Sequence, residues 1–126
     1  MDINIPGNLR YTKDHEWIRA EKDMAYIGIT DFASKELGDI VFVEIETVGE
    51  TLNHHAVFGT VEAVKTVSDM FMPVSGEILE KNPALEATPD IVNKDPYGQG
   101  WMIKIRITNA GELNELLSPD QYKAIL

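Results

Sequence analysis

Hydrophobic and polar positions alternate in short runs along most of the chain, and turn residues separate the runs. The runs "YTKDHEWIRA" and "MAYIGIT" predict a β-hairpin with its turn in "AEKD". A turn is predicted at Gly49, and further strands are predicted in "DIVFVEIE", "HAVFGTVEAV", "TVSDMFMPVSGEILEK" and "WMIKIRIT". Pro73 and Gly76 are expected to break or bend the longest of these runs.

The strand "DIVFVEIE" shows the alternation most clearly. One of its faces would carry Val41, Val43 and Ile45, and the other Phe42, Glu44 and Glu46. Trp17 in "HEW" and Trp101 at the start of "WMIKIRIT" are expected in the core. Phe71 and Met72 could lie partly exposed beside the lysine hairpin, although burial is the more common fate of such side chains.

Other segments carry helix signals. In "TDFASKELGD", Thr30 suits an N-cap and Gly38 a helix stop. "SPDQYKAIL" predicts a C-terminal helix with Ser118 as N-cap and Pro119 at the first helical position, and "AGELNELL" predicts a helical turn. "KNPALEATPDIVNKDPYGQG" reads as a loop. The pattern predicts a mainly β sandwich or barrel with one short internal helix and short C-terminal helices.

Length and charge narrow the functional classes. With 126 residues, a single domain over residues 1–126 is expected. A formal net charge of −10 argues against nucleic acid and against anionic membrane surfaces as partners. No apolar run reaches the roughly 18 residues that span a bilayer, and "MDINIPGNLRY" lacks the features of a signal peptide. A cytoplasmic monomer is therefore expected.

The chain contains no cysteine. Disulfides, thiolate nucleophiles and cysteine-bound metals are therefore excluded. If this protein takes part in thiol chemistry, the sulfur must belong to a group attached to it.

Lys65 is the only Lys or Arg between Lys35 and Lys81, in an otherwise acidic interval. The predicted strands place it at the tip of a hairpin, flanked by Val64 and Val67, with Glu62 three residues before it and Asp69 four residues after it. A solvated turn lysine, a catalytic amine and a modification site all remain open. A Schiff-base lysine needs a desolvated pocket, which an exposed hairpin tip does not provide. Exposed apolar neighbours favour a tip on which another protein docks.

The three histidines give little support for a metal site. His54 and His55 are adjacent, so on a strand their side chains would point to opposite faces, and His15 lies far away in sequence. No metal is therefore expected. The chain also lacks a nucleophile elbow, a P-loop, a dinucleotide fingerprint and a zinc-protease motif.

Four motifs in order resemble the H-protein family of the glycine cleavage system. They are "YTKDHEWI", "GITDFASKELGDIVFVE", "VEAVKTVSDMFMPVSGEILEKN" and the pair formed by Ile91 to Asn93 and Pro96 to Trp101. The resemblance covers nearly the whole chain. It implies a lipoyl/biotinyl-like barrel-sandwich hybrid and a non-catalytic carrier with lipoate in amide linkage to Lys65.

The resemblance also implies the partners. A pyridoxal-phosphate glycine decarboxylase would load an aminomethyl group onto the lipoyl arm, and a folate-dependent aminomethyltransferase would take the one-carbon unit. A dihydrolipoamide dehydrogenase would reoxidise the dithiol, and a lipoate-attaching enzyme would install the arm. By resemblance, Glu62 and Gly76, with Asp69 as a third candidate, help that enzyme to recognise the hairpin, and Glu16 belongs to a cleft that shelters the loaded arm.

The chain departs from the family pattern at several positions. Ala63 stands where many members have serine, Met72 replaces a smaller residue, and Glu36 stands where some members have histidine. "EIETVG" lacks a proline that is often found there. These departures concern how the arm docks and leave the attachment site unchanged.

Several alternatives remain. Biotin carriers place the lysine between two methionines, whereas Val64 and Thr66 flank it here, and lipoyl domains of 2-oxo-acid dehydrogenases carry Asp-Lys-Ala in longer chains. An H-like protein could instead relay lipoate to other lipoyl proteins. A lysine-dependent enzyme lacks companion acid-base residues here. An unmodified interaction module would keep its activity when Lys65 is replaced by Arg.

Overall fold

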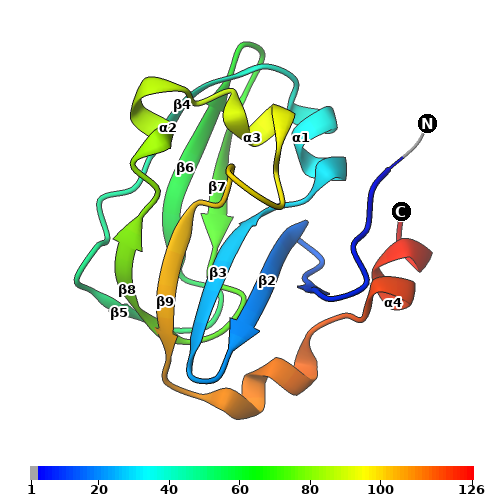
Figure 1. The fold of residues 1–126 in the computed structure, drawn as a ribbon, viewed down its shortest axis with the longest axis vertical. Helices are drawn as coiled ribbons and strands as arrows, with labels where there is room; N and C mark the ends of the chain where they lie inside the picture. The colour runs from blue at the N-terminus through cyan, green and yellow to red at the C-terminus, as the bar shows by residue number, and fades with distance from the viewer. Residues whose placement is uncertain (1–2) are drawn as a thin grey trace.

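The computed structural model describes residues 3–126, whose strands form two antiparallel sheets (Figure 1). The six-stranded sheet has the order β1 (Arg10–Tyr11), β2 (Glu16–Glu21), β3 (Met24–Ile29), β9 (Ile103–Ile107), β8 (Gly76–Lys81), β5 (Thr51–Leu52). The three-stranded sheet has the order β4 (Ile40–Glu44), β6 (Val57–Ala63), β7 (Val67–Phe71). The mainly β prediction is confirmed, and the strand order of the described residues closes neither sheet into a barrel.

The predicted first hairpin is formed by β2 and β3. Trp17 on β2 is fully buried, and its Nε1–H donates to the carbonyl oxygen of Pro96 at 2.9 Å. Its ring lies against Gly28, where an added Cβ would come within 2.8 Å of the indole. Trp101 precedes β9 and is only half-buried, with its ring edge-on to Tyr26. The core prediction therefore holds fully for Trp17 and in part for Trp101.

The predicted faces of β4 are wrong at its first residues. Ile40 and Val43 are buried, whereas Val41 and Phe42 are 47% and 50% exposed. The pairing with β6 shifts between Ile40 and Phe42, as in a β-bulge. Because a bulge adds one residue to one strand, it interrupts the alternation and leaves two successive apolar side chains at the surface.

The longest extended run is divided between the two sheets, as Pro73 and Gly76 predict. It forms β7, then turns, and continues as β8 in the other sheet. Met72, at the end of the first part, is 1% exposed, so it takes the burial that is more common for such a side chain. Phe71 is half-buried, so partial exposure holds for Phe71 alone of the two.

The first and last helices begin as predicted, and the first also ends as predicted. In α1 (Asp31–Leu37), the Thr30 side chain accepts a hydrogen bond from the Ala33 amide, and Gly38 ends the helix with φ 79°. In α4 (Pro119–Ala124), Ser118 forms a capping box with Gln121. Figure 1 shows α1 beside the β6–β7 hairpin and α4 beside the N-terminal segment.

The segment that reads as a loop contains two one-turn helices, α2 (Ala84–Ala87) and α3 (Ile91–Lys94). The prediction of a single internal helix is therefore wrong. Each short helix buries one apolar side chain, Leu85 or Val92. Helices this short depend on tertiary packing rather than on propensity, so the sequence gives little sign of them. The predicted turn after β9 is the 3₁₀-helix η1 (Ala110–Glu115).

Two hydrophobic clusters hold the fold together. The larger joins the two sheets, and includes Ile27, Ile40, Phe58, Val61, Met72, Ile78, Val92, Met102 and Ile105. The smaller consists of Leu9, Tyr11, Trp17 and Tyr122, and its Tyr11 and Tyr122 rings stack at 4.7 Å between centroids. None of the helices formed by residues 3–126 combines the length and apolar character that a membrane span requires.

Candidate functional site

Lys65 occupies the tip of the hairpin formed by β6 and β7, as the alternation predicts. This tip projects at the upper end of the molecule in Figure 1. The Ala63 amide donates to the Thr66 carbonyl at 2.7 Å, closing a tight turn that presents Lys65. The side chain is exposed, and no ion pair formed by residues 3–126 includes its ammonium group. The amine is therefore open to acylation.

The tip also contacts the end of α1. The Val64 amide donates to the Asp39 carbonyl at 3.0 Å. The Lys65 stem lies over Gly38, where an added Cβ would be 3.5 Å from the lysine Cε and 3.9 Å from Nζ. These are ordinary contact distances, so glycine is favoured at position 38 by the positive φ that ends the helix and not by lack of space.

Apolar side chains surround the tip on the open face of the three-stranded sheet. Val64 is 76% exposed and Val67 is 62% exposed. In the row across the three strands, Glu62 of β6 lies between Phe42 of β4 and Val67 of β7. Exposed apolar groups this close together are typical of a surface that another protein covers.

Glu62 and Asp69 lie on this same open face. Both are exposed. Across the β6–β7 pair, Glu62 lies opposite Val67, and Asp69 lies opposite Thr60. The structure therefore brings the two predicted acidic recognition residues together beside the lysine. Their carboxylates stand where an incoming enzyme can contact them directly.

Gly76 is placed differently. It is buried at the start of β8, and an added Cβ would come within 2.8 Å of the Arg106 carbonyl oxygen. Glycine is thus required for the close approach of β8 to β9. Any part that Gly76 plays in recognition must act through the path of the backbone.

A cleft of about 290 Å³ lies between α1 and β7, with mostly apolar walls. It is lined by Asp14, His15, Ile29, Phe32, Ala33, Glu36, Leu37, Ser68 and Met70. The part of the cleft that Leu37 and Ser68 line is near the hairpin tip. The part that Asp14 lines is near the start of β2. Glu36, one of the departures from the family pattern, belongs to its wall.

Glu16 is the buried acid of the site. Its side chain is 1% exposed; Oε1 accepts from the Thr12 hydroxyl at 2.9 Å, and Oε2 accepts from the Phe71 amide at 3.0 Å. Burial raises the pKa of Glu16 to about 8, although both hydrogen bonds favour the charged form. This carboxyl group ties β2 to the end of β7 and holds its proton near neutral pH.

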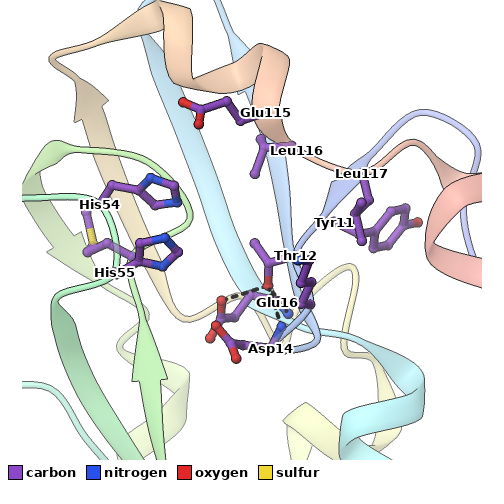
Figure 2. A pocket seen from close by; sticks show the side chains of 11 residues that line it. Tyr11, Thr12, Asp14, Glu16, His54, His55, Glu115, Leu116 and Leu117 are labelled. Atoms are coloured by element: carbon purple, nitrogen blue, oxygen red, sulfur yellow. Dashed lines mark hydrogen bonds between the residues drawn. The ribbon is translucent and has the colours of Figure 1, made fainter. Parts of the chain in front are cut away.

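A second cavity, of about 300 Å³, shares Asp14 with the cleft between α1 and β7 (Figure 2 shows the residues that line it). Glu16 and Thr12 contribute to its wall, and His54 and His55 face it from the segment before β6. The predicted opposite orientation of the two histidines is wrong, because their rings stack with centroids 3.7 Å apart. They do not lie on a strand, and His55 has φ 76°, which turns its side chain to the same side.

The three histidines do not come together with other side chains to form a metal site. His54 Nδ1 lies 3.9 Å from a Glu112 carboxylate oxygen, and His15 Nδ1 lies 2.8 Å from the Tyr122 hydroxyl. Across residues 3–126, no three His, Asp or Glu side chains are arranged to hold a metal ion. The expectation that no metal binds stays a prediction.

Two small antiparallel sheets with one lysine at a protruding hairpin tip define a domain of the lipoyl type. Comparison with known proteins narrows this class. A sequence model described as Glycine cleavage H-protein matches residues 9–126. The chain therefore belongs to the glycine cleavage H-protein family.

Relatives and solved structures agree with this assignment. The chain is 59% identical over 124 residues to the glycine cleavage system H protein of Bacteroides fragilis, covering 98% of each sequence. It is 57% identical over 126 residues to that of Chlorobaculum parvum, again covering 98% of each. The crystal structure of a glycine cleavage system H protein from Mycobacterium marinum matches with a TM-score of 0.87 at 42% identity, covering 96% of this chain and 98% of that one.

Proposed function

We propose that this protein carries a lipoyl group in amide linkage to Lys65 and shuttles the aminomethyl group of glycine between enzymes of the glycine cleavage system. One observation carries the proposal: an exposed lysine, free of ion pairs within residues 3–126, stands at a hairpin tip in a chain of this family. The lipoyl group supplies the dithiol that the cysteine-free chain lacks.

The tip suits a carrier that visits several active sites. The decarboxylase, the aminomethyltransferase and the dihydrolipoamide dehydrogenase must each reach the arm, and a projecting turn leaves room for them. Val64 and Val67 would bury apolar surface against each partner. Carboxylates around them would raise the rate of encounter with basic surfaces while allowing fast release.

Recognition by the lipoate-attaching enzyme is assigned to the open face of the hairpin. Glu62 and Asp69 are exposed there beside Lys65, so they can contact the enzyme directly. Gly76 would contribute only by allowing β8 to lie close to β9. Glu62 and Asp69 are therefore proposed to touch the enzyme, whereas Gly76 is proposed to act only through the shape of the fold.

The α1–β7 cleft is the proposed shelter for the arm. Its apolar walls suit the hydrocarbon part of a lipoyl-lysine chain, and Ser68 lies three residues from Lys65. Glu16 lines the neighbouring cavity, which shares Asp14 with this cleft, and after losing its proton it would hold a cationic group through a charge-assisted hydrogen bond. Glu36 places an acid in the wall of the α1–β7 cleft itself, where some family members have histidine.

Loading by the decarboxylase tests the proposal. The lipoylated protein is incubated with glycine and a glycine decarboxylase, and its intact mass is measured beside a Lys65→Arg control. We expect a gain of one aminomethyl group in the lipoylated protein and none in the control. A lipoylated protein that is never loaded would reject the shuttle and favour the alternative, an H-like protein that relays lipoate.

A further inference from the structure

Asn93, on α3, joins three parts of the chain that are distant in sequence. Its Oδ1 accepts a hydrogen bond from the Ile40 amide at 2.9 Å. Its Nδ2 donates to the Gly38 carbonyl at 2.8 Å and to the Ser34 hydroxyl at 3.1 Å. One side chain thus connects the end of α1, the start of β4 and α3, which lie together near the hairpin tip in Figure 1.

The two peptide groups that Asn93 binds are those on either side of Asp39. The Asp39 carbonyl, which belongs to the same peptide group as the Ile40 amide, accepts the Val64 amide at 3.0 Å, immediately before Lys65. The lysine stem also lies over Gly38. Any change in the path of residues 38–40 therefore moves the acceptor of the tip and the surface beneath the lysine together.

We propose that Asn93 is a positioning residue for acylation of Lys65, acting through residues 38–40. This inference rests on the proposed function, in which an enzyme attaches lipoate to the tip. Within residues 3–126, none of the hydrogen bonds of the Asn93 side chain reaches the amine or the tip. It fixes the segment that holds the tip, so that Lys65 is presented in one geometry.

The side-chain chemistry explains why asparagine suits this position. The Ile40 amide needs an acceptor, and the Gly38 carbonyl needs a donor, so a single group must supply both. A primary amide does so, whereas a carboxylate would set a negative charge against the Gly38 carbonyl oxygen. Alanine would leave both partly buried groups without their partner.

Asn82 provides a matched control. Asn82 lies near the start of the segment 81–100, which also contains Asn93. Its Nδ2 donates to the carbonyl oxygens of Gln99 and Trp101 at 2.7 and 2.8 Å. Its Oδ1 accepts from the Ala84 amide at 3.0 Å. An Asn→Asp or Asn→Ala change costs the same kinds of hydrogen bond at both positions. Only those of Asn93 go to residues 38–40.

The test compares Asn93→Asp and Asn93→Ala with Asn82→Asp and Asn82→Ala, using the full chain. Lipoylation rates are measured with lipoate, ATP and a lipoate-attaching enzyme at varied protein concentration. For the Asn93 variants we expect kcat/KM to fall about tenfold through a higher KM, because fewer molecules hold the tip in the geometry that binds. The Asn82 variants should stay within about twofold of the unaltered protein.

Amide hydrogen exchange gives a readout that needs no lipoylation. The Val64 amide should exchange about tenfold faster in the Asn93 variants. The Met72 amide, bonded to the Ala56 carbonyl at 2.8 Å at the far end of the hairpin, should not change. A structural loss shared by the whole domain would instead accelerate exchange at both amides.

The possible outcomes separate the two proposals. Equal effects at positions 82 and 93, or an unchanged Val64 amide, overturn the role of Asn93. Failure of both Asn93 variants to fold while both Asn82 variants fold also overturns it, because Asn93 would then support the whole domain. If the unaltered protein is not lipoylated, the proposed function fails, while the exchange result still decides whether Asn93 braces the tip.

Discussion

Replacing the buried acid Glu16 by glutamine should change how stability depends on pH. The carboxyl group is 1% exposed and accepts hydrogen bonds from the Thr12 hydroxyl and the Phe71 amide. A glutamine amide has the same shape, and its oxygen can accept from Phe71. Its amino group then faces a Thr12 hydroxyl that already accepts from the Asp14 and Glu16 amides, which adds a cost that does not depend on pH. The substitution therefore removes the ionisation and leaves the packing in place.

The magnitude follows from the pKa of Glu16. Burial raises it from 4.5 to about 8, so between these values the folded protein holds a proton that the unfolded chain has lost. The stabilising contribution is complete below pH 4.5 and is lost as the pH rises through 8. The slope is about 1.4 kcal/mol per pH unit, so the free energy of unfolding should fall by roughly 3 kcal/mol between pH 5 and pH 7.

Urea unfolding at several pH values from 5 to 8 measures this effect. The free energy of unfolding of the unaltered protein minus that of Glu16→Gln should decrease with that slope, because other titrating groups cancel. Glu62→Gln, which changes an exposed acid, should leave the difference flat. A difference for Glu16 that stays constant within about 0.5 kcal/mol would show that its carboxyl group ionises normally and that no proton is held at that site.

Three further substitutions separate shape from recognition around the hairpin. Gly76→Ala, whose Cβ would lie 2.8 Å from a backbone oxygen, should lower the free energy of unfolding by about 2 kcal/mol, and urea unfolding would show whether it does. Glu62→Gln should raise the KM for lipoylation about threefold at low salt and leave stability unchanged, so an unaltered KM would remove Glu62 from recognition. Phe42→Ser, at a side chain that is 50% exposed, should weaken binding to the decarboxylase about tenfold in a titration, whereas unchanged binding would place that partner on another face.

The hairpin tip can be predicted from sequence because it depends on local order alone. Alternation in the two runs around Lys65, together with the absence of other positive charge nearby, is enough to indicate it. The caps at Thr30 and Ser118 are predictable for the same reason, since each bonds within its own first turn. The family resemblance supplies the lipoyl group, the partner enzymes and the recognition residues.

Features that depend on distant contacts cannot be predicted in this way. The bulge that exposes Val41 depends on how β4 pairs with β6, and the stacked pair of His54 and His55 depends on a positive φ at a residue other than glycine. Asn93 lies in a segment that the sequence indicates as a loop, and its hydrogen bonds reach 53 to 59 residues back along the chain.

That the chain is a cytoplasmic monomer stays a prediction.

Intact mass measurement tests the carrier function most directly. The protein is treated with lipoate, ATP and a lipoate-attaching enzyme beside a Lys65→Arg control, which keeps the charge but lacks an amine that can be acylated. We predict a gain of one lipoyl group, mapped to Lys65 and absent from the control. No gain, under conditions that modify another lipoyl domain, would contradict the carrier function and leave an unmodified interaction module.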